Sequence, residues 1–300
     1  IPELREKIAS HLKKKRVHFE EVMVTAGVTG GLLLASLALI NPGDEVIIPD
    51  PYFVMYEYQV LLMAGVPVFV DTYPDFRLKQ EELIKKISKK TKFIIINSPN
   101  NPTGTVYSKD ELMMVAKIAR ERDLLILSDD IYDNFVFDAP TCLCMGQLYE
   151  RTLTFGGFSK GWAMTGWRLG YAAGPREILQ HMITLQQYTF SSINSFAQKA
   201  ALKALDLNVN DYIARYKKKR DIIYEGVKKK YRVQKPLGAF YIFPEVPGGN
   251  GEAFVEKAIQ NNLFIIPGSV FSKRNTHVRI SFAASEETLL RGIEVLNRIS

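Results

Sequence analysis

Hydrophobic and polar positions follow one pattern along the first two thirds of the chain. Short apolar runs, among them DEVIIP (44–49), VPVFVDT (66–72) and FIIINSP (93–99), alternate with longer segments in which apolar residues recur every three to four positions. Short apolar runs are typical of buried strands, and the periodic segments are typical of amphipathic helices. Up to about residue 195 this alternation predicts a mainly parallel sheet covered by helices.

The pattern changes after about residue 205. A long charged helix is predicted over 212–229, and short strands, single helices and a final helix over 286–298 follow it. We therefore predict an α/β protein with a large domain over 16–205, whose sheet is mixed but mainly parallel, and a smaller α+β domain over 206–300. The first helix, within 1–15, is expected to pack near the small domain.

Composition excludes several classes of protein. With 47% hydrophobic and 24% charged residues, the 300-residue chain is typical of a globular protein with a large core. The net charge of +7 is spread along the chain, and no nucleic-acid-binding motif accompanies its lysine runs. Apolar runs are too short to cross a membrane, and no signal peptide is visible. We predict no nucleic-acid partner, no membrane partner and no metal site.

The cysteines and the first residue bear on where the protein resides. Cys142 and Cys144 are the only cysteines, and their spacing is poor for a disulfide, which favours a reducing compartment such as the cytoplasm. The chain opens with Ile1 instead of methionine. We therefore expect that further residues precede it in the translation product.

A glycine-rich stretch over 154–174, TFGGFSKGWAMTGWRLGYAAG, carries the first candidate chemistry. It holds one lysine, Lys160, and one arginine, Arg168, among glycines and small hydroxyl residues. A lysine amine can form a Schiff base with a carbonyl if its pKa is lowered from the free value of about 10.4. A surface lysine in a loop is the ordinary alternative, but the density of aromatic residues and glycines is unusual for a solvated loop.

Other candidate residues lie at the predicted strand ends. A strand, a glycine-rich turn and a helix over 22–40 predict an anion site around Thr29, although a plain connection fits equally well. Aromatic residues begin the next helix at Tyr52 and Phe53. Asn101 lies in a proline-rich loop where ligands bind in open α/β sheets. Asp129 ends an apolar strand, where an unpaired carboxylate is costly and favours a cationic partner.

Together these residues describe one ligand. The anion turn and Arg168 favour a phosphate, an aromatic residue favours a flat ring, Asp129 favours a protonated nitrogen, and Lys160 favours a carbonyl. Pyridoxal 5′-phosphate carries all four groups.

The motifs NPTG (101–104) and SK…GWRLG around Lys160 and Arg168 point to a protein family. Over essentially its whole length, the chain resembles the class I/II pyridoxal-phosphate-dependent aminotransferases, the fold type I family that includes aspartate aminotransferase. The resemblance implies a transaminase that moves an amino group between an L-amino acid and a 2-oxo acid by a ping-pong, Schiff-base mechanism. It also implies a homodimer with pyridoxal phosphate as cofactor.

The resemblance implies roles for residues around the cofactor ring. Lys160 resembles the Schiff-base lysine that also moves the proton, and Asp129 resembles the acid that keeps the ring nitrogen protonated. Tyr132 and Asn101 resemble the pair that hydrogen-bonds the phenolic oxygen of the ring. Phe53 is the best match for the aromatic residue that stacks on the ring, with Tyr52 as the second choice.

Further roles concern the phosphate and the substrate. A set of five residues resembles the phosphate site, namely Gly27, Val28, Thr29, Ser159 and Arg168. Arg279, in HVRISFA, resembles the arginine that binds the substrate α-carboxylate, and Asn101 is expected beside it.

Two departures from the family pattern accompany these matches. A serine that often helps to hold the phosphate is replaced by Gly157, so one donor is lost. The start IPELRE (1–6) resembles a segment that follows a substantial N-terminal stretch in the family, and that stretch is missing here.

Two alternatives to an aminotransferase share these motifs. The first is a carbon–sulfur β-lyase on the same scaffold, which the motif residues do not separate from a transaminase. The second is the aminotransferase-like domain of a transcriptional regulator, against which the complete segment from the lysine to the arginine argues.

Overall fold

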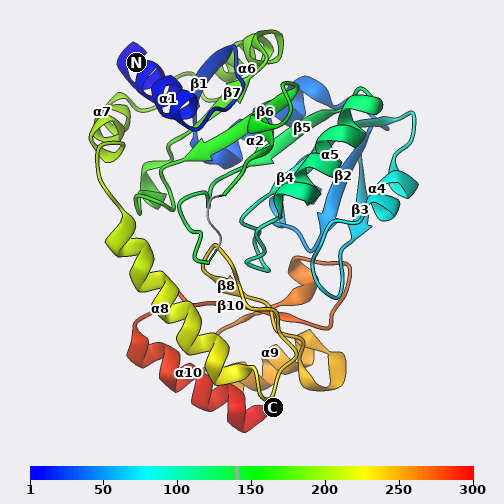
Figure 1. Cartoon of the computed structure of the whole chain (residues 1–300), viewed down its shortest axis with the longest axis vertical. Helices are drawn as coiled ribbons and strands as arrows, with labels where there is room; N and C mark the ends of the chain where they lie inside the picture. The colour runs from blue at the N-terminus through cyan, green and yellow to red at the C-terminus, as the bar shows by residue number, and fades with distance from the viewer. Residues whose placement is uncertain (139–141) are drawn as a thin grey trace.

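The computed structural model describes residues 1–138 and 142–300, and it contains a large sheet in the upper part of Figure 1 and a small sheet below it. The larger sheet has seven strands: β1 (Glu21–Thr25), β2 (Glu45–Asp50), β3 (Val66–Asp71), β4 (Thr91–Asn97), β5 (Leu125–Asp129), β6 (Thr152–Gly157) and β7 (Gly170–Gly174). Their order is β1-β7-β6-β5-β4-β2-β3. Strand β7 runs antiparallel to both of its neighbours, β1 and β6, and all other pairs are parallel, which confirms the predicted mainly parallel sheet.

The direction of the strands decides which side chains meet. In the parallel pair β4 and β5, Asn97 lies opposite Asp129, and both are the last residues of their strands. The antiparallel strand β7 begins at Gly170, opposite the last residue of β6, Gly157. The segment from β6 to β7, which contains Lys160, therefore starts and ends at the same edge of the sheet as the ends of β4 and β5.

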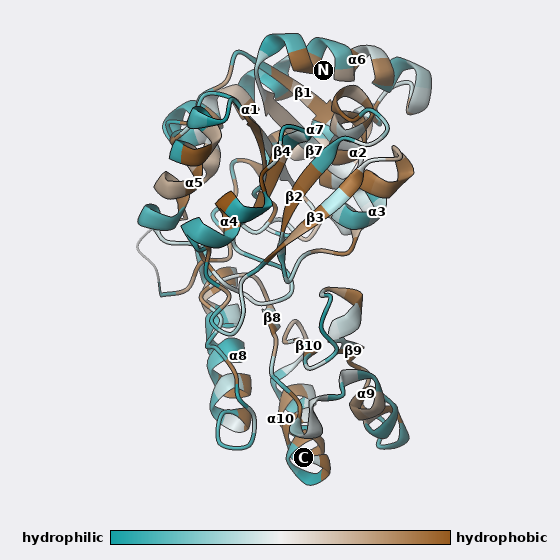
Figure 2. Ribbon diagram, turned by 90° about the vertical axis from the view of Figure 1, so that its right-hand side faces the viewer, coloured by the Kyte–Doolittle hydropathy of each residue, from teal (hydrophilic) through white to brown (hydrophobic). Residues whose placement is uncertain are grey.

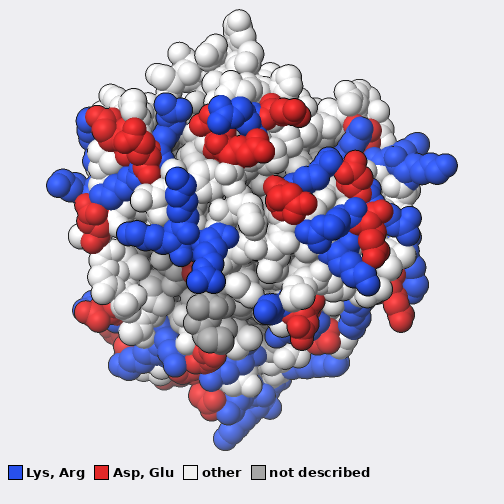
Figure 3. All heavy atoms as spheres, turned by 45° about the horizontal axis from the view of Figure 1, so that its top comes forward, with Lys and Arg blue, Asp and Glu red and all other residues white. Residues whose placement is uncertain are grey.

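Helices cover both faces of this sheet, as predicted. One face carries α2 (Gly27–Leu39), α3 (Met55–Leu62) and α6 (Arg176–Thr189). The other carries α1 (Pro2–Lys14), α4 (Gln80–Lys86), α5 (Lys109–Glu121) and α7 (Ser195–Ala204). Strand β1 shows the alternation that this requires, because Met23 packs with the α2 layer while Val22 and Val24 pack with α1 and α7. Figure 2 shows hydrophobic strands in the sheet and helices that carry both polar and hydrophobic residues, and charged side chains of both signs are spread over the face seen in Figure 3.

Helix α1 corrects one expectation. Its buried residues Leu4, Ile8 and Leu12 pack with β1 and α7, in the upper part of Figure 1, and not with the small sheet. The spacing of four residues correctly predicts one apolar stripe. The spacing does not say which surface the stripe covers. In the structure, α1 and α7 together bury one face of β1 and β7.

The small sheet is antiparallel and has the order β8-β10-β9, with β8 (Tyr241–Ile242), β9 (Ile266–Pro267) and β10 (Val278–Ser281). Three helices pack around it, α8 (Asn210–Val227), α9 (Gly251–Gln260) and α10 (Glu286–Ile299), and α8 and α10 lie side by side (Figure 1). The predicted boundary near residue 205 falls between α7 and α8; the division into two domains there stays a prediction. Short 3₁₀ turns complete the elements: η1 (Met145–Gln147), η2 (Thr165–Trp167), η3 (Pro247–Gly249) and η4 (Gly268–Val270).

The loop between β9 and β10 ties the small sheet to the large one. The Lys273 backbone N–H donates to a carboxylate oxygen of Asp50 at 3.0 Å, and the Tyr73 hydroxyl donates to the Ser272 hydroxyl at 2.8 Å. These bonds place the small sheet against the ends of β2 and β3. In the described ranges, no helix has the length and apolar character that spanning a membrane requires.

The burial of α1 yields a stability prediction. Ile8 is fully buried, so Ile8→Ala should lower the free energy of unfolding in urea by about 2–5 kcal/mol. The matched control is Ile259→Ala in α9, where the side chain is 48% exposed, and we expect a change within about 0.5 kcal/mol there. Equal effects of the two substitutions would contradict the packing of α1 on the large sheet.

Candidate active site

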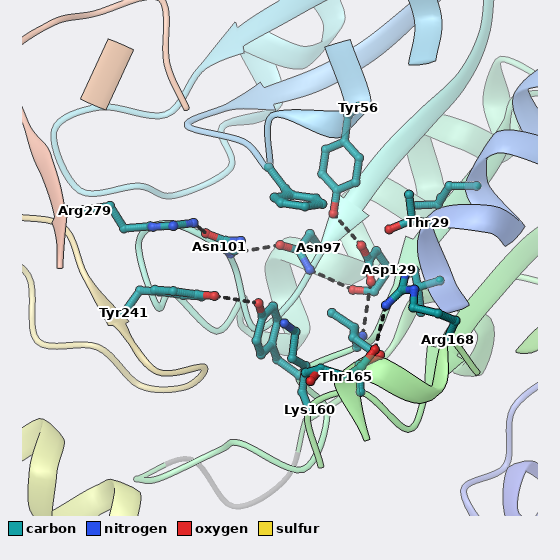
Figure 4. A pocket seen from close by; sticks show the side chains of 16 residues that line it. Thr29, Tyr56, Asn97, Asn101, Asp129, Lys160, Thr165, Arg168, Tyr241 and Arg279 are labelled. Atoms are coloured by element: carbon teal, nitrogen blue, oxygen red, sulfur yellow. Dashed lines mark hydrogen bonds between the residues drawn. The ribbon is translucent and has the colours of Figure 1, made fainter. Parts of the chain in front are cut away.

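A cavity of about 280 Å³ lies at the edge of the large sheet where β4 and β5 end. Sixteen residues line it: Val28, Thr29, Leu32, Phe53, Tyr56, Asn97, Asn101, Asp129, Ile131, Tyr132, Ser159, Lys160, Thr165, Arg168, Tyr241 and Arg279 (Figure 4). Every predicted site residue is among them except Gly27, which precedes Val28 at the start of α2. The structure thus brings together residues that lie as far apart in the sequence as Val28 and Arg279.

Asp129 is the only carboxylate among the described residues that line this cavity. Its side chain is buried, accepts a hydrogen bond from the Tyr56 hydroxyl at 2.7 Å and accepts a second from the Ile131 N–H at 3.2 Å. Burial raises the pKa of Asp129 to about 6, while the Tyr56 and Ile131 hydrogen bonds and the charge of Lys160 oppose this rise. The arrangement disfavours the charged form unless a cation comes close, as the sequence predicts.

Lys160 lies just beyond the end of β6, with its amine in the cavity (Figure 4). Among the residues that the structure describes, the amine has neither a hydrogen-bond acceptor nor an ion-pair partner. Its nitrogen lies 5.8 Å from the centre of the Phe240 ring and 6.0 Å from that of Tyr132. Burial lowers the pKa of Lys160, and the positive charges of Arg168 and Arg279 lower it further. A lowered pKa is what a nucleophilic amine needs.

The first turn of α2 and Arg168 form one end of the cavity. No side chain within the described ranges caps this helix, so its first N–H groups are free to bind an anion. A Cβ on Gly27 would lie 3.0 Å from a guanidinium nitrogen of Arg168. A Cβ on Gly170 would lie 2.8 Å from the Val28 nitrogen, so only glycine lets β7 approach this turn. Thr29 adds a hydroxyl, and the whole end is electropositive.

The structure explains the departure at Gly157. A Cβ at this position would lie 3.0 Å from a methyl carbon of Ile131 and 3.2 Å from one of Val28. These two side chains therefore occupy the space into which a serine would project. Ser159, two residues later, lines the cavity and keeps one hydroxyl near this end.

Arg279 forms the opposite end of the cavity, on strand β10 of the small sheet. Its guanidinium donates to the side-chain oxygen of Asn101 at 3.0 Å. Within the described part of the chain, no carboxylate pairs with Arg279. Burial lowers the pKa of Arg279. A half-buried cation without an acidic partner favours an anionic ligand.

A chain of hydrogen bonds runs from Arg279 at one end of the cavity to the end of strand β5. The Asn101 N–H donates to the Asn97 side-chain oxygen at 2.9 Å, and the Asn97 amide donates to the Asp129 carbonyl oxygen at 2.9 Å. Figure 4 shows these bonds running from Arg279 through Asn101 and Asn97 to Asp129. The Arg279 guanidinium is therefore linked through Asn101 and Asn97 to the backbone of Asp129, the residue that carries the buried acid.

The aromatic residues are placed as follows. Phe53 lines the cavity, whereas Tyr52 packs on Phe69 in the core, with 4.9 Å between ring centres. Of the two sequence candidates, only Phe53 can therefore contact a ligand in the cavity. Tyr132 also lines the cavity, and its hydroxyl lies 3.2 Å from that of Tyr241.

Sequence reasoning missed several lining residues, chiefly Tyr56, Asn97, Thr165 and Tyr241. Asn97 carried a usable signal, because it is a polar residue at the end of an apolar strand, as Asp129 is. Tyr56, in the first turn of α3 and three residues after Phe53, carried a weaker signal. Nothing local marks Tyr241, because only the packing of the small sheet against the large one brings it to the cavity.

Comparisons with known proteins agree with this geometry. The sequence model of the family "Aminotransferase class I and II" matches residues 1–296. A probable aspartate aminotransferase of Methanocaldococcus jannaschii is 38% identical over 313 residues, which cover 100% of this chain and 83% of that protein. Aromatic-amino-acid aminotransferase 2 of Thermococcus litoralis is 37% identical, over 100% of this chain and 82% of that protein.

Solved structures give the same result. The aromatic aminotransferase of Pyrococcus horikoshii superposes with a TM-score of 0.96 at 37% identity, over 100% of this chain and 85% of that one. An aspartate aminotransferase of Thermotoga maritima has a TM-score of 0.94 at 34% identity, over 99% and 81% of the two chains. Neither is a lyase or a DNA-binding regulator by name. The chain therefore belongs to the class I and II aminotransferases, and it is an enzyme of that family with their fold type I α/β architecture.

Proposed function

We propose that this aminotransferase uses pyridoxal 5′-phosphate to exchange an amino group between an L-amino acid and a 2-oxo acid. The charge pattern of the cavity is the observation that carries the proposal. Lys160, Arg168 and Arg279 line the cavity with no acidic partner among the described residues, while the one carboxylate of the described lining, Asp129, is buried. A phosphate, a carboxylate and a protonated ring nitrogen would neutralise Arg168, Arg279 and Asp129, and a carbonyl would react with the Lys160 amine.

The residues present fit the cofactor. The uncapped start of α2, Thr29 and Arg168 would hold the phosphate, since both a helix N-terminus and a guanidinium favour that anion. Phe53 offers a flat face for the ring, and Asp129 offers a carboxylate for its nitrogen. Gly27 and Gly170 keep the phosphate end open, because a side chain at either position would crowd Arg168 or the first turn of α2.

The cofactor supplies a carbonyl for amines and a ring that accepts electrons from carbon. The chain supplies the rest. Lys160 would hold the cofactor at its carbonyl carbon, and the Lys160 amine, once freed by the substrate amine, would take the proton of the substrate α-carbon and return it. Asp129 would keep a proton on the ring nitrogen by its negative charge. Tyr132 and Asn101 are proposed to hydrogen-bond the phenolic oxygen of the ring.

Arg279 is proposed to bind the α-carboxylate that amino acids and 2-oxo acids share. A guanidinium can make two parallel hydrogen bonds to a carboxylate, which fixes orientation as well as position. Because the same end of the cavity serves both substrates, the amino group can leave with one acid and return with the next. Relatives bear the names aspartate and aromatic-amino-acid aminotransferase, so these two donor classes are the first to assay.

We also propose a homodimer in a reducing compartment. Two apolar side chains near the phosphate end are exposed: Trp167, next to Arg168, at 45%, and Phe196, whose ring centre lies 6.3 Å from that of Trp167, at 69%. Such a cluster is typical of a surface that another chain covers. The mass in solution, compared with 34.0 kDa for one chain, tests this. Cys142 and Cys144 are both free, which supports the cytoplasm.

Lys160→Ala is the first test of the function. The substitution removes the amine that binds the cofactor carbonyl, so the visible absorbance of protein mixed with pyridoxal phosphate should be lost. The 2-oxo-acid-dependent rate should fall by about 10²–10⁴-fold or more. Lys117→Ala, at a side chain 74% exposed, is the matched control and should change neither quantity. A visible band that survives in the Lys160→Ala protein would rule the assignment out.

The same assay separates a transaminase from a lyase. A transaminase consumes one 2-oxo acid for each amino acid, whereas a β-lyase releases ammonia and pyruvate without a second substrate. Turnover of the unaltered protein that requires no 2-oxo acid would contradict our proposal.

Arg279→Leu tests the carboxylate site. Loss of a buried cationic partner typically costs about 2–5 kcal/mol, so kcat/KM should fall by about 30- to 5,000-fold while the visible cofactor band is retained. Arg274→Leu is the control, because this nearby arginine pairs with Asp71 at the surface. If kcat/KM for every amino acid stays within about threefold after Arg279→Leu, the α-carboxylate binds elsewhere.

Asp129→Asn tests the buried acid through stability. The native pKa of about 6 lies above the usual value of 3.8, so the native state holds this proton more tightly than the unfolded state. The charged carboxylate therefore costs stability progressively as pH rises from about 4 to 6, by at most about 3 kcal/mol above that range. The cofactor-free Asp129→Asn protein should be more stable than the unaltered protein at about pH 8, with little difference at about pH 4.

Urea unfolding at the two pH values measures this difference. Asp123→Asn is the control, because its side chain is 80% exposed and should show no such pH dependence. The reverse order of stability at the higher pH would mean that Asp129 is satisfied within the protein and does not depend on a cationic ligand.

A further inference from the structure

Tyr241 is a buried tyrosine of the small sheet that has no role in the function described so far. It lies on β8, next to β10, the strand that carries Arg279. The guanidinium carbon of Arg279 lies 4.5 Å from the centre of the Tyr241 ring and 4.2 Å from that of Phe271. Contacts this close are attractive, because the face of an aromatic ring is electron-rich. The two rings therefore limit the orientations that the Arg279 side chain can adopt.

The hydroxyl of Tyr241 makes a different contact. It lies 3.2 Å from the hydroxyl of Tyr132, on the large-sheet side of the cavity, and both tyrosines are buried. Figure 4 shows Tyr241 beside Arg279, with a dashed line from the Tyr241 hydroxyl to this partner. One side chain thus contacts both the proposed carboxylate-binding residue through its ring and a proposed cofactor-binding residue through its oxygen.

We propose that Tyr241 is a positioning residue of the aminotransferase reaction, whose ring orients Arg279 for the substrate carboxylate and whose hydroxyl orients Tyr132 toward the cofactor ring. The proposal rests on the function proposed above and adds a residue to it. Arg279 makes another polar contact from the small sheet into this cavity, through Asn101. Through Tyr241, the position of the small sheet affects the proposed cofactor site as well as the proposed substrate site.

The direction of the hydroxyl pair follows from hydrogen counting. A negatively charged ring oxygen can only accept hydrogen bonds, and Tyr132 has a single hydroxyl hydrogen to donate to it. Tyr241 must then donate its own hydrogen to the Tyr132 oxygen. Consecutive hydrogen bonds of this kind polarise one another, so the donor at the end of the chain becomes stronger. Removing the Tyr241 hydroxyl weakens Tyr132 as a donor.

Two substitutions separate the ring from the hydroxyl. Tyr241→Phe keeps the aromatic face beside Arg279 and removes only the hydroxyl. Tyr241→Leu removes the aromatic face and the hydroxyl together. Each protein is loaded with pyridoxal phosphate, and two quantities are measured: the pH midpoint of its visible absorbance change without substrate, and the dissociation constants of succinate and 3-phenylpropanoate, two carboxylates that cannot react.

In the Tyr241→Phe protein the midpoint should rise by about 0.2–0.6 pH units, because the charge on the ring oxygen loses part of its stabilisation and the proton is released at a higher pH. The carboxylate dissociation constants should stay within about twofold. In the Tyr241→Leu protein the midpoint should rise similarly, and carboxylate binding should weaken by about 3- to 30-fold through loss of the cation–π contact.

Tyr216→Phe is the matched control. Tyr216 also shares a hydrogen bond with a second tyrosine, Tyr212, at 3.1 Å, but it lies outside the cavity lining. Its removal should change neither the midpoint nor the dissociation constants. The Tyr241→Phe protein must also unfold at the same temperature as the unaltered protein within a few degrees, so that a general loosening of the structure is not read as a specific effect.

The outcomes are distinct. An unchanged midpoint in the Tyr241→Phe protein, together with unchanged carboxylate binding in the Tyr241→Leu protein, overturns the proposal for Tyr241 while the proposed function stands. A midpoint shift of the same size in the Tyr216→Phe control overturns it as well. If the unaltered protein forms no visible band that depends on Lys160, both the function and the role of Tyr241 fall together.

Discussion

The structure depends on one electrostatic constraint, the convergence on one cavity of charges that do not neutralise one another within the described chain. Lys160, Arg168 and Arg279 approach one cavity whose described lining contains a single carboxylate, that of Asp129. Hydrogen bonds from Tyr56 and Ile131 hold the Asp129 carboxylate in a buried position. Such an arrangement is costly for an isolated protein and favourable once a ligand of opposite charge pattern binds.

The topology of the large sheet makes this constraint possible. Three parallel strands in a row, β4, β5 and β6, end at one edge, and the reversed strand β7 begins there. One edge of a sheet therefore receives Asn97, Asp129 and Lys160 from strand ends, and Arg168 from the residues just before β7. A sheet with β7 parallel would start that strand at the far edge, and Arg168 would lie far from the start of α2. The antiparallel strand β7 is thus part of the site.

The small sheet completes the cavity from the other side. It contributes Arg279 and Tyr241, which reach across to Asn101 and Tyr132 of the large-sheet side. The contacts between the β9–β10 loop and the ends of β2 and β3 hold the two sheets in this relation. The proposed substrate and cofactor sites are therefore mechanically linked, because the same short strands carry both contacts. This link between the two sites follows from the positions of these side chains and not from the family fold alone.

The sequence by itself determined the local elements and much of the chemistry. Apolar runs and helical spacing predicted the alternating strands and helices, and the SK…GWRLG segment with NPTG pointed to Lys160, Arg168 and Asn101 without any knowledge of the fold, because such motifs are local in the chain. Tertiary structure alone decided between Tyr52 and Phe53, placed α1 on the large sheet, filled the space beside Gly157 with Ile131, and brought Tyr56 and Tyr241 to the cavity. The physical reason is the same in each case: periodicity shows that a side chain is buried, but only the packing of distant elements shows against what.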